Sequence, residues 1–211
     1  AYCQYVSNIF SFSTQVLNND YYAHVFGKSA AKQTQTYDFS DITNPFEEAS
    51  ALFAVENGYM QAKSRTEFGA QTSATYGEVL YALYRMAGGT QSLSDDAVIT
   101  WAQEHALISD DVSAQDTVTY GSVSRLFLRY LADRKIDVSL TETDKTQLAQ
   151  IQAGYTELDD TTCLAMYWMR KHAILQDNDL GQYYSLAHQV LNRAQVSRCL
   201  QGISSLVQPT S

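Results

Sequence analysis

The chain has 211 residues, of which 45% are hydrophobic and 12% aromatic, and only two are proline. This is enough apolar material for one compact domain or a short array of units. The net charge of −9 disfavours nucleic acid and anionic membranes as partners, because like charges repel. No apolar stretch is long enough to span a bilayer, so we expect no membrane insertion.

Residues 1–36 are predicted to form an N-terminal helix followed by a loop. Apolar residues recur at roughly helical spacing over residues 2–26, whereas residues 27–36 are small and polar. The apolar positions are Tyr2, Tyr5, Val6, Ile9, Phe10, Val16 and Leu17. The first residue is Ala rather than Met, which fits either removal of a signal peptide or a chosen chain boundary.

Two helices are predicted in a first unit over residues 37–90. Pro45 suits the first turn of one helix, and Asn57-Gly58 ends it because both residues tolerate positive φ. Thr75 can cap the second helix, with Glu78 three residues on in the capping-box pattern. Gly88-Gly89 then ends that helix.

The same plan recurs over residues 91–143 and again over 144–211. In the second unit one helix follows Leu93-Ser94-Asp95, and Thr119 caps the next. The third unit is preceded by a short connector helix over residues 144–153, and its first helix follows Leu158-Asp159-Asp160. Its second helix is predicted to bury Ala187, Val190, Leu191 and Ala194, and a tail that packs and then frays is expected from Cys199.

Aligned residues indicate that the units are repeats, which predicts an all-α fold of three helix-loop-helix units. The sets that align across the three units are Phe53, Trp101 and Trp168; Asn57-Gly58, His105-Ala106 and His172-Ala173; Tyr76, Tyr120 and Tyr184; and Arg85, Arg129 and Arg193.

At these residues the sequence resembles the S-layer homology (SLH) domain, a threefold repeat that anchors many bacterial surface proteins. The first unit carries the resemblance through Phe39-x-Asp41, Ala54-Val55-Glu56-Asn57-Gly58, Phe68 and Thr75-Tyr76-Gly77-Glu78. The second matches through Leu93-x-Asp95, Trp101-Ala102-Gln103-Glu104 and Thr119-Tyr120-Gly121-Ser122. The third matches through Trp168 and the Tyr184 segment, so the likeness covers about residues 39–195.

The resemblance implies a pseudo-threefold helical spindle that binds an acidic cell-wall polysaccharide in grooves between units. It also implies a secreted, non-catalytic module at the bacterial cell surface that needs no cofactor. The family has Arg in its Thr-Arg-Ala-Glu segment, whereas this alignment places Tyr there in all three units. Losing a charge-assisted contact costs roughly 1.5–3 kcal/mol per site. A neutral glycan stacked on Tyr and Trp, or no ligand, is the resulting alternative.

Eight residues form the predicted ligand site: Asp41, Lys63, Arg65, Tyr76, Trp101, Tyr120, Trp168 and Tyr184. Each also has a structural interpretation. The tyrosines suit packing in a first helical turn, and the tryptophans lie on apolar faces. The aspartates Asp41, Asp95 and Asp160 suit helix capping, and the two basic residues suit a solvated loop.

The sequence contains no nucleophile elbow, P-loop, dinucleotide fingerprint or zinc-protease motif, so no enzyme is predicted. The three cysteines match no metal or redox spacing, and we expect buried thiols rather than a disulfide. No metal site is predicted. The second functional hypothesis is a helical scaffold that binds a protein partner or spaces other domains.

Overall fold

The computed structural model describes residues 37–109, 111–175 and 183–207. The chain divides into two compact units, Ala1–Thr36 and Tyr37–Ser211, and every element below belongs to the second. The helix predicted over residues 2–26, the loop over 27–36 and Cys3 lie outside the described residues.

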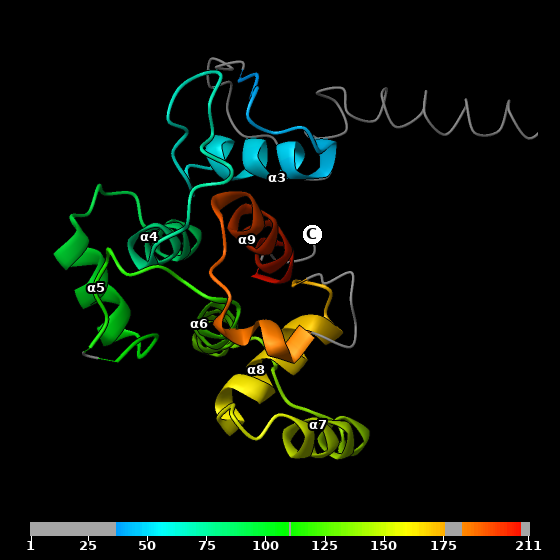
Figure 1. Cartoon of the computed structure of the whole chain (residues 1–211). Coiled ribbons are helices and arrows are strands. Elements are labelled where there is room, and N and C mark those ends of the chain that lie inside the picture. Colours follow the sequence, from blue (N-terminus) through cyan, green and yellow to red (C-terminus); the bar gives the residue numbers. More distant parts are fainter. Residues whose placement is uncertain (1–36, 110, 176–182, 208–211) are drawn as a thin grey trace, which may run out of the picture. The chain divides into compact units, whose positions relative to one another are not determined.

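The described part of the chain is all-helical, which confirms the all-α part of the predicted fold class (Figure 1). Its elements are α3 (Pro45–Glu56), α4 (Tyr76–Met86), α5 (Asp95–Glu104), α6 (Tyr120–Asp133), α7 (Glu142–Gly154), α8 (Asp160–Lys171), the 3-10 helix η1 (Tyr183–His188) and α9 (Arg193–Val207). Among these residues, extended pairing occurs as three isolated bridges. None of the described helices has the length and apolar character needed to cross a membrane.

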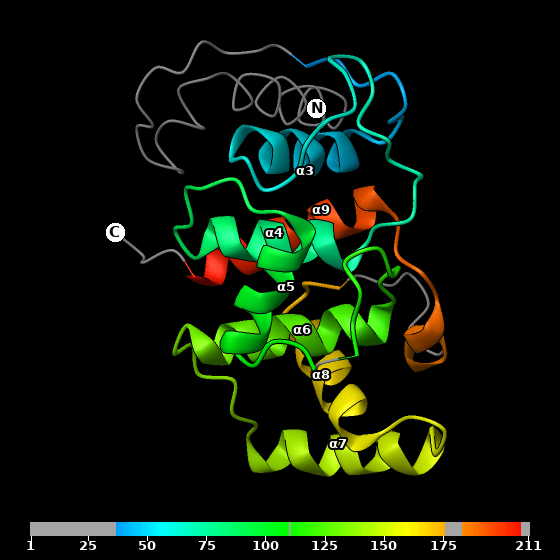
Figure 2. The same ribbon diagram turned by 90° about the vertical axis from the view of Figure 1, so that its left-hand side faces the viewer.

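Three inner helices, α4, α6 and α9, each carry one outer helix. Helix α5 packs against α4, α8 against α6, and α3 against α9 (Figure 1). The first described helix therefore pairs with the last, so the helical array closes on itself. Helix α7 packs on α8, at the opposite end of the described part from α3 (Figure 2).

A ring of backbone hydrogen bonds joins the three segments that lead into the inner helices. The Ala74 N–H donates to Leu191 O (2.9 Å), the Leu191 N–H to Val118 O (3.0 Å), and the Val118 N–H to Ala74 O (3.0 Å). All three residues are fully buried. Because a buried backbone group without a partner is costly, this ring holds the three segments in a defined register.

Each inner helix begins with a reciprocal capping box directly after the ring. The predicted box of Thr75 and Glu78 on α4 is confirmed, and Thr119 and Ser122 repeat it on α6. On α9, the Asn192 side chain accepts from the N–H of Gln195 and the Gln195 side chain accepts from the N–H of Asn192, both at 2.8 Å.

The predicted second helix of the third unit was wrong in position. Residues 183–188 form the short helix η1, the chain is extended at Val190–Asn192, and the long helix starts at Arg193. Arg193, rather than Tyr184, is therefore the first residue of its inner helix, as Tyr76 and Tyr120 are of α4 and α6. The tail predicted from Cys199 belongs to α9, where Cys199, Leu200 and Ile203 are buried. Apolar side chains one helical turn apart favour continuing that helix.

The outer helices begin with caps other than the predicted aspartates. Asn44, Ser94 and Asp159 accept from the first-turn N–H groups of α3, α5 and α8. Asp95 and Asp160 are instead the first helical residues, where a negative charge favours the helix dipole. Asp41 caps no described helix.

The outer helices end alike. Gly58, Ala106 and Ala173 follow the helix ends with φ of 70°, 53° and 54°. The predicted helix end at Asn57-Gly58 is confirmed. The aligned pairs His105-Ala106 and His172-Ala173 end their helices with the same positive-φ geometry.

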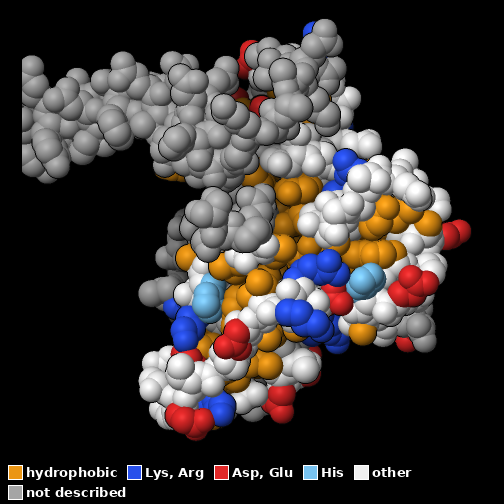
Figure 3. All heavy atoms as spheres, turned by 180° about the vertical axis from the view of Figure 1, so that it is seen from behind, with side chains coloured by type: hydrophobic (Ala, Val, Ile, Leu, Met, Phe, Trp, Pro, Cys, Tyr) orange, Lys and Arg blue, Asp and Glu red, His pale blue; other side chains and the backbone are white. Residues whose placement is uncertain are grey.

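Side chains from all three inner helices build one main core, which includes Leu80, Leu83, Phe127, Leu131 and Leu200. A smaller cluster of Leu148, Cys163 and Tyr167 joins α7 to α8. Seen from behind, hydrophobic side chains reach the surface in the middle of the described part, with Lys and Arg beside them (Figure 3). Cys163 and Cys199 are free buried thiols.

Candidate binding grooves

A first groove of about 440 Å³ lies where the start of α9 meets the loop after α3 and the starts of α4 and α5. Its polar lining includes Gln61, Lys63, Thr72, Glu78, Asp95 and Arg193. The capping box places Arg193 in the first turn of α9, so its side chain extends from a fixed backbone.

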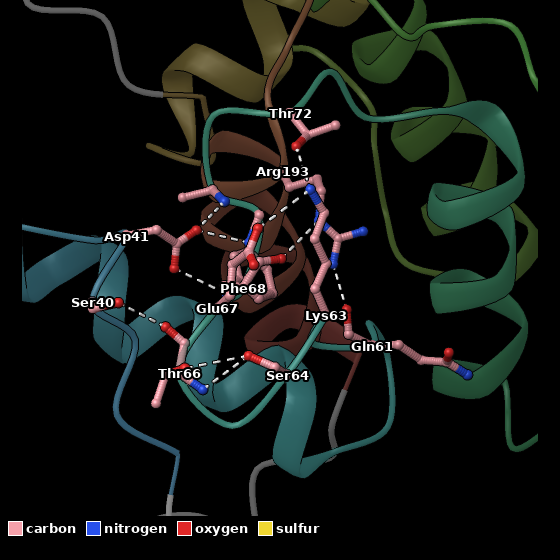
Figure 4. A network of polar contacts seen from close by, with 12 residues as sticks. Ser40, Asp41, Gln61, Lys63, Ser64, Thr66, Glu67, Phe68, Thr72 and Arg193 are labelled. Carbon is pink, nitrogen blue, oxygen red and sulfur yellow. Dashed lines mark hydrogen bonds and ion pairs between the residues drawn. The ribbon is translucent and has the colours of Figure 1, made fainter.

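Arg193 is the most constrained cation of the first groove, since the residue is only 6% exposed. Its Nε donates to Phe68 O at 3.1 Å, and a terminal nitrogen donates to Gln61 O (Figure 4). The other terminal nitrogen donates to the Glu78 carboxylate. The guanidinium lies 4.8 Å from the centre of the Phe68 ring. Burial lowers the pKa of Arg193, but a guanidinium remains charged at neutral pH.

Asp41 orders the loop that presents Phe68 to Arg193. Its carboxylate accepts from the N–H groups of Phe68 (2.9 Å), Gly69 (2.7 Å) and Ala70 (2.8 Å). Burial acts to raise the pKa of Asp41, but the backbone donors outweigh it and hold the pKa below its ordinary value. Asp41 thus supports the groove from behind and is absent from its lining.

Lys63 and Arg65 are both exposed, but only Lys63 lines the groove. Lys63 Nζ donates to Thr72 Oγ1 at 3.0 Å and lies 3.7 Å from a Glu67 carboxylate oxygen. Its stem crosses Gly69, where a Cβ would lie 2.6 Å from Lys63 Cε and φ is +79°. Gly69 therefore serves both the turn and the close approach of the lysine.

A second groove of about 320 Å³ lies where the start of α4 meets the loop after α5 and the start of α8. Tyr76 occupies here the place that Arg193 holds in the first groove. Arg129 Nη1 donates to Leu107 O at 3.1 Å, and Arg125 Nη1 lies 3.5 Å from Asp159 Oδ2. Two arginines therefore face one aspartate among the lining residues described.

Asp159 stays ionised in this groove and competes with any anionic ligand. Burial acts to raise its pKa, but hydrogen bonds from Thr161 and Thr162, together with the charge of Arg125, lower the pKa to about 2. The side chain is more than half exposed, so solvent screens its pairing with Arg125.

The third equivalent residue, Tyr120, is buried rather than presented to a groove. Its hydroxyl accepts from Gln195 Nε2 at 3.1 Å, and the residue is 7% exposed. Gln195 thus contacts Tyr120 much as Glu78 contacts Arg193. The structural interpretation of the tyrosine at this position is the one that fits Tyr120.

The tryptophans line neither groove. Trp168 is 2% exposed and stacks on His172 with ring centres 3.9 Å apart, so it is a core residue. Trp101 is half-buried and packs edge-on against Tyr84 at 5.5 Å. Tyr184 also lies outside both grooves and lines a separate cavity beside α7.

Sequence reasoning missed most of the polar groups that line the grooves, namely Gln61, Thr72, Glu78, Arg125, Asp159 and Arg193. One signal was present for Arg193, because Asn192-x-x-Gln195 is a capping pattern that marks a helix start. Arg125 and Asp159 meet through tertiary packing of α6 on α8, which no local pattern reports.

No protein-family model matches this chain, and no curated protein matches it. Among the residues described, no group of three or more His, Cys, Asp or Glu side chains is placed to hold a metal ion.

Proposed function

We propose that this chain is a non-catalytic module that attaches to a bacterial cell envelope by binding an acidic cell-wall polysaccharide in the two grooves. The proposal includes three SLH-like units related by a pseudo-threefold axis. The observation that supports it is that Arg193 begins the inner helix of the third unit, where the resemblance to the family would place a ligand-binding arginine.

The backbone supports this assignment at three equivalent points. The N–H of Tyr76 donates to Asp116 O (2.9 Å), that of Tyr120 to Gln189 O (3.1 Å), and that of Arg193 to Thr72 O (3.0 Å). Asn192-Arg193-Ala194-Gln195 then resembles the Thr-Arg-Ala-Glu segment of the family. The replacement of arginine by tyrosine applies to two units instead of three.

The charge of the second groove favours an acidic glycan over a neutral one. In a chain of net charge −9, this groove gathers Arg125 and Arg129 against Asp159, whereas in the first groove Glu78 and Asp95 balance Lys63 and Arg193. Guanidinium groups hydrogen-bond carboxylates with matched geometry. Tyr76 adds a half-buried ring at the second groove, which suits stacking on a sugar.

Co-sedimentation with purified bacterial sacculi tests the proposal, with and without their secondary polymer. We expect saturable binding that disappears when the polymer is removed. Lys63→Gln should weaken binding several-fold, up to about tenfold, because it removes one groove cation. Arg65→Gln removes the same charge from the same loop outside the groove, and should change nothing.

Equal binding to stripped and intact sacculi would refute the secondary polymer as the ligand, and equal loss in both variants would refute the groove as its site. Arg193→Lys keeps the charge but removes the planar fork, and we expect it to bind less tightly than the unmodified chain. Circular dichroism of each variant verifies that the helices are retained.

The alternative is a helical scaffold that binds a protein. The hydrophobic side chains exposed on the back of the described part favour it (Figure 3). A stable complex with an envelope protein, together with no retention on sacculi, would select this alternative.

A further inference from the structure

The three junctions between neighbouring inner helices follow one cyclic plan. At each junction the first residue of one inner helix donates its N–H to the loop before the next inner helix. At two junctions its side chain also contacts the third residue of that next helix. Arg193 of α9 donates to the Glu78 carboxylate of α4, and the Tyr120 hydroxyl of α6 accepts from Gln195 Nε2 of α9 at 3.1 Å.

Glu78 and Gln195 each fill their junction while they cap their own helix. One carboxylate oxygen of Glu78 accepts from the Thr75 N–H, and the other accepts from Arg193. The Gln195 oxygen accepts from the Asn192 N–H at 2.8 Å, and its amide nitrogen contacts the neighbouring helix. A long side chain with two polar atoms can therefore perform both tasks at once.

The third junction lacks this side-chain contact, because Ser122 is the third residue of α6. Its short hydroxyl accepts from the Thr119 N–H at 2.8 Å and donates to Thr119 O at 3.1 Å, so it is used within its own cap. Tyr76 is the residue that a longer side chain would meet, and its hydroxyl makes no hydrogen bond within the described part of the chain. Both Tyr76 and Ser122 line the second groove. This groove is therefore the junction that the protein leaves unfilled.

Two cations line the unfilled junction. Arg129 is exposed, and its Nη1 donates to Leu107 O at 3.1 Å, a neutral partner for one of its five N–H donors. Arg125 lies 3.5 Å from Asp159 Oδ2, and the Asp159 side chain is 58% exposed, so solvent screens this pair. A guanidinium presents donors on more than one edge, so each arginine can keep these partners and hold an anion as well.

We propose that the second groove binds a sugar carboxylate at the place where the other two junctions have a long side chain. This inference rests on the proposed glycan-binding function and assigns the acidic group of the glycan to one groove. The carboxylate accepts from the Tyr76 hydroxyl and pairs with Arg125 and Arg129. The sugar ring lies against Ile108 and Val112, which are partly buried in the groove lining. In the first groove an internal carboxylate already occupies the equivalent place, which favours this chemical group over a neutral one.

A variant that fills the junction tests the site. Ser122→Gln gives α6 the residue that α9 has at this place, so its oxygen can cap Thr119 and its amide can donate to Tyr76. We expect its urea midpoint to stay at or above that of the unmodified chain. Its binding of D-glucuronate should fall about tenfold or more, because the place of the carboxylate is occupied. Ser122→Ala keeps the junction open and should bind glucuronate about tenfold more tightly than Ser122→Gln does. Titration of the ¹⁵N-labelled chain, followed through the backbone amides of Ile108 and Val112, measures the binding.

The charge requirement has its own pair of variants. Arg129→Gln should weaken glucuronate binding about tenfold, because a charge-assisted contact is lost. Arg65→Gln removes the same charge outside both grooves and should bind glucuronate as the unmodified chain does. D-Glucose should bind the unmodified chain about tenfold more weakly than glucuronate, or not at all.

Absence of a saturable shift with glucuronate overturns the proposal, as does equal binding of glucose or undiminished binding by Arg129→Gln. Undiminished binding by a folded Ser122→Gln would place the ligand elsewhere. If Ser122→Gln loses its helical circular dichroism signal, Arg129→Gln and the glucose comparison still decide. Sacculi test the wider function independently. A chain that binds sacculi through their polymer but shows no glucuronate site would retain the proposed function and contradict this inference.

Discussion

Replacing Asp41 with asparagine should destabilise the fold, because one carboxylate accepts three backbone N–H groups from Phe68, Gly69 and Ala70. The N–H groups of Gly69 and Ala70 both donate to Oδ2, so an asparagine oxygen in that place keeps these two bonds. Its NH₂ group then faces the Phe68 N–H, so one charge-assisted bond is lost and the other two become neutral. At about 1.5 kcal/mol for the lost bond and about 0.5 kcal/mol for each weakened one, we expect a loss of about 2–3 kcal/mol.

Urea unfolding at pH 7, followed by circular dichroism, measures this change. Asp38→Asn is the matched control, because Asp38 is exposed and lies three residues earlier in the same segment, and we expect it to stay within about 0.5 kcal/mol of the unmodified chain. A loss of less than about 1 kcal/mol in Asp41→Asn would refute the assigned role of the carboxylate.

The pH dependence gives a second test of the same carboxylate. The pKa of Asp41 is lowered in the folded state, so its contribution is fully present above its unfolded pKa and is lost as pH falls through the folded pKa. The stability gap between the unmodified chain and Asp41→Asn should be constant from pH 7 to about 5 and should shrink below about pH 4. A gap that is as large at pH 3 as at pH 7 would show that charge is not its cause.

Two further changes should stabilise the chain. Tyr130 is fully buried, and its hydroxyl has no hydrogen-bond partner within the described part, so Tyr130→Phe should leave the free energy of unfolding unchanged or raise it by about 1 kcal/mol; a loss above 1 kcal/mol would contradict this. Ala106 is exposed with φ of 53°, so Ala106→Gly should raise the free energy of unfolding by about 0.5–1 kcal/mol. Ala149→Gly, on the exposed face of α7, should lower it by about as much. Urea midpoints measure all three variants, and a destabilising Ala106→Gly would contradict the strain assigned to that position.

The helix boundaries were predicted correctly wherever a few adjacent residues form a cap or end a helix. Pro45, Asn57-Gly58 and the Thr75 capping box all lie where we expected them. The third unit was misplaced because Tyr184 is a better match to Tyr76 and Tyr120 by residue type than Arg193 is. The register is decided by the backbone ring at Leu191, a long-range contact that residue similarity does not report.

The candidate grooves were predictable only in part. Lys63 and Tyr76 do line grooves, whereas Arg65 lies outside them and Trp168 is in the core. Residues such as Arg125 become part of a groove only when α6 packs on α8. Packing between helices brings such side chains together, and the order of residues along one chain does not report that packing.

The hydrogen-bonded ring also constrains the order in which the chain can fold during synthesis. Ala74 and Val118 complete their backbone pairing only when Leu191 arrives, and α3 obtains its packing partner only with α9. During synthesis the early helices therefore keep apolar faces exposed until α9 has emerged from the ribosome. Such a chain gains its stability late and nearly all at once, which favours a single cooperative folding step over unit-by-unit assembly.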